Sequence, residues 1–322
     1  MPTPLLLAVP NVSEGRDPVV IEEIAAAFAG QGDGGSSARR GPSQHSPEGV
    51  RVLDTHSDPD HNRSVYTLAG PQAQIADAVM SGARAAVARI DVLARPDDGQ
   101  HPRVGALDVA PIVYLNRDSR GAAFAEALVL ADRIAFELEI PVFLYGELAG
   151  GRTRAELRRG GVRALAARLA RGAGAGGTRE SKDGQLRPDF GPPRLHPSAG
   201  ATLVAAREPL VAFNLVLSPP AGVADARRVA SLIREGGEHG LPGVRAIGVE
   251  LSGARAQVSI NVERPFDVPL AQVLTAVSRH APVASAEIVG LVPSAALEGF
   301  PADTPLLGFD PDRCVLEKAL RS

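Results

Sequence analysis

The sequence predicts an α+β fold of two ferredoxin-like lobes, because a β-α-β-β-α-β order of expected elements occurs twice along its 322 residues. A stretch rich in glycine and proline, 172–200, separates the two copies. We therefore expect a first subdomain over 1–177, a connector over 178–200 and a second subdomain over 201–322. A cleft or tunnel between two such lobes is a natural place for a ligand.

The first helix of the first copy carries the clearest local signals. Asp17 is a typical N-cap residue, and Pro18 fits the first helical position. Apolar residues then recur at helical spacing as far as residue 29. Over 30–49 the composition changes to Gly, Ser, Pro, Gln and Arg, and we expect a flexible surface insertion there. The other elements expected in this copy are strands at 5–9, 50–55, 64–69, 106–115 and 142–145 and helices at 71–90, 121–138 and 154–170.

The second copy repeats this order with short apolar strands and amphipathic helices. Its expected strands are 203–217, 244–251, 256–262 and 284–290, and its expected helices are 223–235 and 269–279.

Charge and composition narrow the class of protein. A net charge of −3 argues against a nucleic-acid partner, because phosphate binding needs clustered positive charge. The short basic stretch 152–159 is expected to form the solvated face of a helix. The single cysteine, Cys314, cannot form an internal disulfide, which fits a reducing compartment. Apolar runs fall far short of the ~20 residues of a membrane helix, and no leader precedes the first strand, so we expect a cytoplasmic protein without a membrane partner.

Histidine, aspartate and arginine gather in three loops, 54–63, 97–103 and 188–198. In the first loop, His56, Asp58, Asp60 and His61 are spaced as metal ligands could be. A polar turn also explains them, because aspartates at strand ends bond to their own backbone and Pro59 fixes the bend. A metallohydrolase would need further histidines in a supporting motif. We favour the turn and expect no metal.

Residues 146–153 differ by one residue from a phosphate-binding P-loop. The missing residue is the lysine that reaches the terminal phosphates, and Arg152 is not an equivalent point charge. A Gly-rich turn into a helix is the simpler interpretation, with a weak anion site as the alternative.

His101 is the candidate for acid–base chemistry. Pro102 restricts the backbone of His101 to extended conformations. Asp97 and Asp98 are close enough in sequence to stabilise an imidazolium if the fold brings them near. With a reference pKa of about 6.5, a histidine can take and return one proton near neutrality. From these residues alone, a solvated surface histidine is the alternative.

Short segments with distinctive composition follow one another along the whole chain: VPNVSEG at 9–15, NRSVYT at 62–67, HPRVGALD at 101–108, FLYGE at 143–147, PDFGP at 188–192, AFN at 212–214 and VGLVP at 289–293. Taken together and in order, they resemble the formiminotransferase family. The resemblance implies two ferredoxin-like lobes with folate in a tunnel between them. It also implies transfer of the formimino group of N-formimino-L-glutamate to N5 of tetrahydrofolate, in histidine degradation and one-carbon metabolism.

The resemblance also implies roles for particular residues. The catalytic histidine of the family lies in its His-Pro-Arg motif, which maps onto His101. This residue would take the N5 proton and deliver it to the departing glutamate nitrogen. Tetrahydrofolate would be a co-substrate, and no metal would be needed. The folate-contacting stretch of the family maps onto Gly191, Pro192, Pro193, Arg194, Leu195, His196, Pro197, Ser198, Ala199 and Gly200.

Both implied substrates carry carboxylates, and two arginines are candidates for bidentate contacts to them. These are Arg63 and Arg103. The structural alternative is that they pair with Asp58, Asp60 or Asp108.

The chain departs from the family pattern at several positions. His56 stands where vertebrate members carry an acidic residue, and Leu195 and Ala199 replace aromatic residues of the folate stretch. The chain ends at Ser322, so a cyclodeaminase would be a separate protein, and we expect a homodimer. Two alternative functions stay open. One is a formyltransferase using 5-formyltetrahydrofolate and glutamate, and the other is a non-catalytic folate-binding protein, which would have no need of His101.

Overall fold

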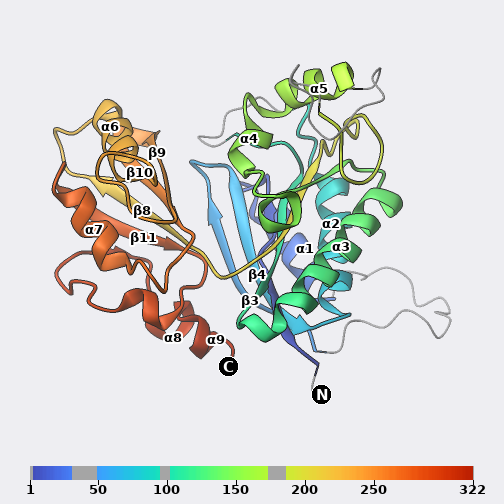
Figure 1. Cartoon of the computed structure of the whole chain (residues 1–322), viewed down its shortest axis with the longest axis horizontal. Coiled ribbons are helices and arrows are strands. Elements are labelled where there is room, and N and C mark those ends of the chain that lie inside the picture. The colour runs from blue at the N-terminus through green and yellow to red at the C-terminus, as the bar shows by residue number, and fades with distance from the viewer. Residues whose placement is uncertain (1–2, 31–48, 95–101, 173–185, 322) are drawn as a thin grey trace. The chain divides into compact units, whose positions relative to one another are not determined.

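The computed structural model describes residues 3–30, 49–94, 102–172 and 186–321. Its internal contacts divide the chain into two compact units, Met1–Arg207 and Glu208–Ser322 (Figure 1). Both units combine a sheet with helices, which confirms the predicted α+β class. Within the described ranges no helix combines the length and the apolar character that crossing a membrane requires.

The described residues of the first unit form a seven-stranded sheet. Its strands are β1 (Leu5–Ala8), β2 (Asn11–Val12), β3 (Arg51–Asp58), β4 (Arg63–Pro71), β5 (Leu107–Tyr114), β6 (Val142–Leu144) and β7 (Thr202–Arg207). β1 and β2 both lie between β4 and β5 and pair antiparallel with each. β3 extends the sheet beyond β4, while β7 and then β6 extend it in parallel beyond β5.

Helices cover both faces of this sheet. They are α1 (Pro18–Phe28), α2 (Ile75–Arg89), α3 (Arg120–Glu137), α4 (Arg154–Arg158) and α5 (Gly161–Gly172). The first three share one hydrophobic core with strand residues such as Val142 and Val204. Neighbouring strand residues, such as Phe143 and Leu203, point to the opposite face and pack with α4 and α5. Asp17 caps α1 as predicted, accepting hydrogen bonds from the amides of Val19 and Val20.

The single helix predicted over 154–170 is wrong, because the chain breaks between α4 and α5. Gly160 and Gly161 have φ angles of 75° and 67°, a left-handed conformation that side-chain-bearing residues rarely adopt. Leu157 of α4 and Leu165 of α5 nevertheless pack in the same hydrophobic cluster. The adjacent glycines are the local signal for the break.

The described residues of the second unit form a five-stranded sheet in the order β12-β11-β8-β10-β9. These strands are β8 (Val211–Leu217), β9 (Val244–Leu251), β10 (Arg255–Val262), β11 (Val283–Val289) and β12 (Leu306–Leu307). Helices α6 (Val223–Ile233) and α7 (Leu270–Ser278) pack on one face. The short helices α8 (Pro311–Cys314) and α9 (Leu316–Ala319) were not predicted, and 3-10 turns occur at Arg117–Ser119, Gly146–Ala149, Ser252–Ala254 and Ser294–Leu297.

The strand predicted over 203–217 is two strands in two different sheets. β7 pairs with β5 and β6, whereas β8 pairs with β10 and β11. Pro209 lies between them and has no amide hydrogen to continue a ladder. The chain passes between units at Arg207 and Glu208, so residues 186–200 lie inside the first unit rather than between the units.

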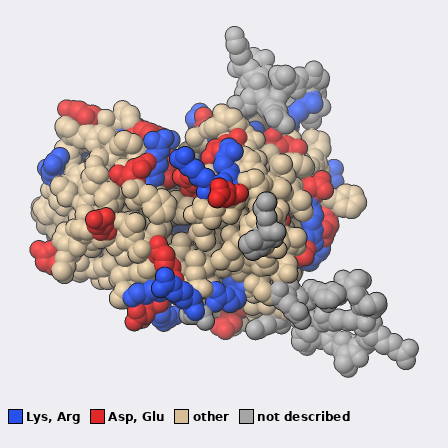
Figure 2. All heavy atoms as spheres, turned by 60° about the horizontal axis from the view of Figure 1, so that its bottom comes forward, with Lys and Arg blue, Asp and Glu red and all other residues tan. Residues whose placement is uncertain are grey.

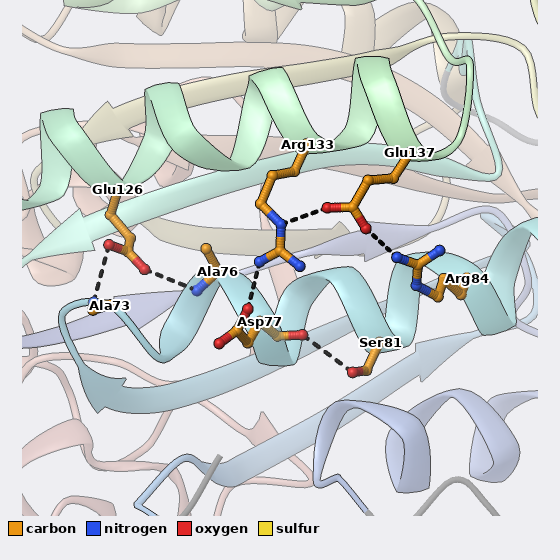
Figure 3. Close-up of polar contacts among 8 residues, drawn as sticks. All are labelled: Ala73, Ala76, Asp77, Ser81, Arg84, Glu126, Arg133 and Glu137. Carbon is orange, nitrogen blue, oxygen red and sulfur yellow. Dashed lines mark hydrogen bonds and ion pairs between the residues drawn. The ribbon is translucent and has the colours of Figure 1, made fainter. Parts of the chain in front are cut away.

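Charged side chains join α2 to α3 (Figure 3). Glu126 is buried at 4% exposure and accepts hydrogen bonds from the amides of Ala73 and Ala76 at 3.1 and 3.0 Å. Gln74, the N-cap residue of α2, makes no capping bond with its own side chain, so a carboxylate from α3 performs the capping. Along the same interface Arg133 contacts Asp77 and Glu137, and Arg84 contacts Glu137.

Candidate active site

Three motif segments meet at one end of the first sheet. The Arg103 guanidinium donates to the carbonyl oxygen of Asn62 at 3.1 Å. The Asn62 side-chain oxygen accepts from the amide of Gly15 at 3.1 Å, and the Ser13 hydroxyl donates to the carbonyl oxygen of Gly105 at 2.7 Å. Residues just after β2, just before β4 and just before β5 are thereby held together.

The stretch 191–200 joins the same place through its main chain. The amide of Ala106 donates to Ala199, and the amide of Ala201 donates to Val104, each at 2.9 Å. A Cβ on Gly105 would overlap the carbonyl oxygen of Ala201, so the close approach of these two segments requires glycine. The segment that follows His101 is therefore attached to the stretch implied for folate. His101 itself, with Asp97 and Asp98, lies outside the described residues, as do residues 31–48 of the expected insertion.

His196 organises the end of that stretch. Its Nδ1 accepts from the amide of Ala199 at 3.0 Å, and its main chain exchanges hydrogen bonds with Gly200 at 2.9 and 3.2 Å. Burial lowers the pKa of His196, partly offset by the charge of Glu139, which favours the neutral ring that this acceptor role requires. In this stretch Gly191, Pro193, Arg194 and Pro197 are exposed, Pro192, Leu195, His196 and Ser198 are partly buried, and Ala199 and Gly200 are buried.

Asp58 and His61 close the turn between β3 and β4. The Asp58 carboxylate contacts Nδ1 of His61 and accepts from the His61 amide at 3.0 Å. Burial alone would raise the pKa of Asp58, but hydrogen bonds from His61 and the charges of His61 and Arg63 lower it to about 2. His56 lies within β3, opposite Val65. These contacts make the run a polar turn, and no group of three or more His, Cys, Asp or Glu able to hold a metal occurs among the described residues.

Arg63 begins β4 and is partly buried, with its Nε withdrawn from water. Its Nε is buried and has no hydrogen-bond partner among the described residues. Burial, together with the charges of Arg158 and Arg154, lowers the pKa of Arg63 to about 10, although the charges of Asp58 and Asp108 act in the opposite direction. Of the two predicted carboxylate-binding arginines, Arg63 thus has no side-chain acceptor among the described residues, whereas Arg103 has one in the carbonyl oxygen of Asn62.

The Gly-rich stretch 146–153 is a turn that leads into α4. Gly150 and Gly151 both have positive φ angles, and Thr153 caps the helix through a capping box. Arg152, at the P-loop lysine position, donates to the Leu144 carbonyl oxygen and contacts the buried carboxylate of Asp189. Its charge is therefore used inside the unit.

The basic segment 152–159 is not the solvated helix face that was predicted. Arg158 contacts Asp108, with side-chain exposures of 15% and 8%. The guanidinium carbon of Arg154 lies 5.8 Å from the centroid of the Tyr145 ring. Sequence reasoning did not identify Arg154 and Arg158 as site residues. The available signal was their i,i+4 spacing, which puts both on one side of a short helix.

Basic and acidic side chains are interspersed over the face of the molecule that Figure 2 shows. This arrangement differs from the clustered positive charge that nucleic-acid binding requires.

Comparisons with known proteins agree with the motifs. A family profile described as the formiminotransferase domain, N-terminal subdomain, matches residues 5–207. The chain is 34% identical over 295 residues to glutamate formimidoyltransferase of Streptococcus pyogenes serotype M1, covering 90% of this chain and 89% of that protein. For the Thermoplasma acidophilum protein of the same name, identity is 34% over 301 residues, covering 91% and 89%.

The chain is also similar to longer proteins. It is 35% identical over 308 residues to formimidoyltransferase-cyclodeaminase of Sus scrofa, covering 91% of this chain and 51% of that protein. It thus spans about half the length of this relative. The profile match and the similarity to both kinds of relative show that the chain belongs to the formiminotransferase family.

Proposed function

We propose that this protein is a glutamate formimidoyltransferase, which transfers the formimino group of N-formimino-L-glutamate to N5 of tetrahydrofolate. The observation that carries the proposal is the similarity to two proteins of that name over about nine tenths of both chains. Tetrahydrofolate is the co-substrate in this proposal, and proton transfer by a side chain replaces any need for a metal.

His101 is the proposed acid–base residue. It takes the proton that the attacking amine releases and returns it to the glutamate nitrogen as that group departs. Such proton transfer contributes ~10²–10⁴-fold to a rate. Support comes from the residues that follow in the motif, because Arg103 is bound to Asn62 and the Val104 amide donates to Asp108 at 2.7 Å.

We further propose that folate contacts the stretch 191–200 and binds between two ferredoxin-like lobes. The strand order supports such lobes: β3, β4, β1 with β2, and β5 in the first unit, and β9, β10, β8 and β11 in the second. This is the order that a β-α-β-β-α-β chain takes in a ferredoxin-like sheet. Arg63 is the proposed carboxylate contact, and the bond of Arg103 to Asn62 supports a positioning role for Arg103.

A turnover assay tests the function and the residue together. The wild-type protein should use N-formiminoglutamate in preference to N-formylglutamate. His101→Ala should lower kcat by ~10²-fold or more while folate affinity changes little, because a proton shuttle acts on the transition state. His101→Asn should be nearly as impaired, since it cannot carry a titratable proton.

The matched control is His239→Ala, an exposed histidine that stacks on His280 in the second unit. It should keep wild-type turnover. Preference for N-formylglutamate would favour the formyltransferase. Retention of more than about a third of kcat in either His101 variant would remove His101 as the acid–base residue.

A further inference from the structure

Three arginines and two aspartates interact electrostatically at the end of the first sheet nearest α4. Arg63, Arg154 and Arg158 are close enough for the last two to affect the titration of the first. The neighbouring carboxylates are already engaged, Asp58 with His61 and Asp108 with Arg158. The described residues provide Arg63 with no hydrogen bond or ion pair through its guanidinium.

Several donors of this group are also buried without a partner. Nε of Arg63, Nε of Arg158 and the hydroxyl of Tyr145 have no hydrogen-bond partner among the described residues. Tyr145 is 6% exposed, and Arg154 lies over its ring. Unpartnered buried donors are costly and uncommon in folded proteins. An acceptor supplied by a ligand would satisfy them.

We propose that Arg63, Arg154 and Arg158, with the hydroxyl of Tyr145, bind the carboxylate of a glutamyl group. Guanidinium groups present paired N–H donors that match the two oxygens of a carboxylate. The choice of a glutamyl group rests on the proposed function, because both substrates of that reaction carry glutamate carboxylates. The site adds Arg154, Arg158 and Tyr145 to Arg63, which is one of the two arginines that the sequence suggested.

The effect of a substitution on stability distinguishes a ligand-binding role of Arg63 from a structural one. Removing a buried charge that has no partner should not weaken the fold, whereas removing one partner of a buried pair should. Arg63→Met should therefore leave the unfolding temperature unchanged or raise it. The matched control is Arg152→Met, which removes a buried arginine from its contact with Asp189 and should lower the unfolding temperature.

Binding is measured on the full chain with N-formyl-L-glutamate, p-aminobenzoyl-L-glutamate and inorganic sulfate. The wild-type protein should bind at least one glutamyl probe, and Arg63→Met should weaken that binding about 10- to 100-fold. Weaker binding of N-formyl-L-glutamate would assign the site to the one-carbon donor. Weaker binding of p-aminobenzoyl-L-glutamate would assign it to the glutamate tail of folate. Tyr145→Phe, which removes only the hydroxyl, should weaken the same probe severalfold at an unchanged unfolding temperature.

Three results would overturn the site. The first is wild-type affinity for both glutamyl probes in Arg63→Met and Tyr145→Phe, and the second is sulfate binding as tight as that of the glutamyl probes. The third is an unfolding temperature of Arg63→Met that is lowered as much as that of Arg152→Met. Turnover separates this proposal from the proposed function. Arg63-dependent glutamyl binding without formimino transfer would leave the site standing and refute the activity. Normal turnover with an unchanged KM in Arg63→Met would refute the site alone.

Discussion

Asp58 and His61 form a hydrogen-bonded pair at the turn before β4. The imidazole is almost fully buried, at 1% side-chain exposure, and the carboxylate is at 16%. A buried ring nitrogen needs a hydrogen-bond partner, and a partly buried carboxylate needs donors. The contact fixes the main chain immediately before Asn62 and Arg63, so it positions residues of the candidate site without belonging to the proposed chemistry.

This pair predicts an acid-sensitive contribution to stability. The folded-state pKa of Asp58 is about 2, below its usual value of 3.8, so the unfolded chain binds more protons between these values. The contribution is therefore present above about pH 4 and is lost as pH falls toward 2. In Asp58→Asn, the unfolding free energy should decline less steeply between pH 4 and 2 than in the wild type. At pH 7 the substitution should lower the unfolding free energy by roughly 1–3 kcal/mol. Chemical unfolding measured against pH checks this.

The control for Asp58 is Asp303→Asn, at an exposed turn of the second unit. It should reproduce the wild-type profile. Parallel wild-type and Asp58→Asn curves between pH 4 and 2 would show that the contact with His61 adds no pH-dependent stability.

At the scale of elements, α2 begins with help from another helix. Its first amides are satisfied by Glu126 of α3 rather than by a residue next to them in sequence. The carboxylate also lies at the positive end of the α2 dipole. The start of α2 and the packing of α3 are therefore coupled.

Replacing Glu126 should expose that coupling. Glu126→Ala should lower the unfolding free energy by about 2 kcal/mol, because the freed amides of Ala73 and Ala76 are left without their acceptor. Glu126→Gln keeps one acceptor oxygen and should cost roughly half as much. Glu22→Ala on the exposed side of α1 should change stability by less than about 0.5 kcal/mol. Equal effects of all three substitutions in denaturant unfolding would contradict the capping role.

At the scale of the whole molecule, the motifs are divided between two units. The segments 9–15, 62–67, 102–108, 143–147 and 188–192 belong to the first unit, and 212–214 and 289–293 belong to the second. In the second unit, Asn214 of β8 donates to Glu287 of β11 at 3.1 Å, and Asn214 is 1% exposed. A ligand that uses both sets of motifs would have to contact both units.

Hydrogen exchange on the full chain tests that expectation. With 5-formyltetrahydrofolate as the probe, amides of 194–200 in the first unit and of β8 in the second should exchange more slowly when the ligand is bound. The amides of α5 should serve as an internal control and stay unchanged. Protection confined to one unit would place the ligand away from the proposed site between lobes.

Local signals accounted for much of the fold. The cap and first turn of α1 and the bounds of β9 agree with the sequence-based expectations, because N-capping and strand alternation act over a few neighbouring residues. The motif residues also indicated the family, which the comparisons confirmed. Whether His101 acts as an acid and base stays a prediction.

The sequence by itself determined the α+β class, the repeated order of elements and the family. Only the tertiary structure decided that residues 202–207 and 211–217 belong to different sheets, that Glu126 caps α2, and that Arg154 and Arg158 lie near Arg63. The physical reason is range: propensity and periodicity depend on residues a turn or two apart, whereas sheet membership and charge compensation depend on partners far along the chain. Arg63 illustrates this, because only the structure shows that Asp58 and Asp108 are engaged elsewhere and that no described residue supplies an acceptor to Nε of Arg63.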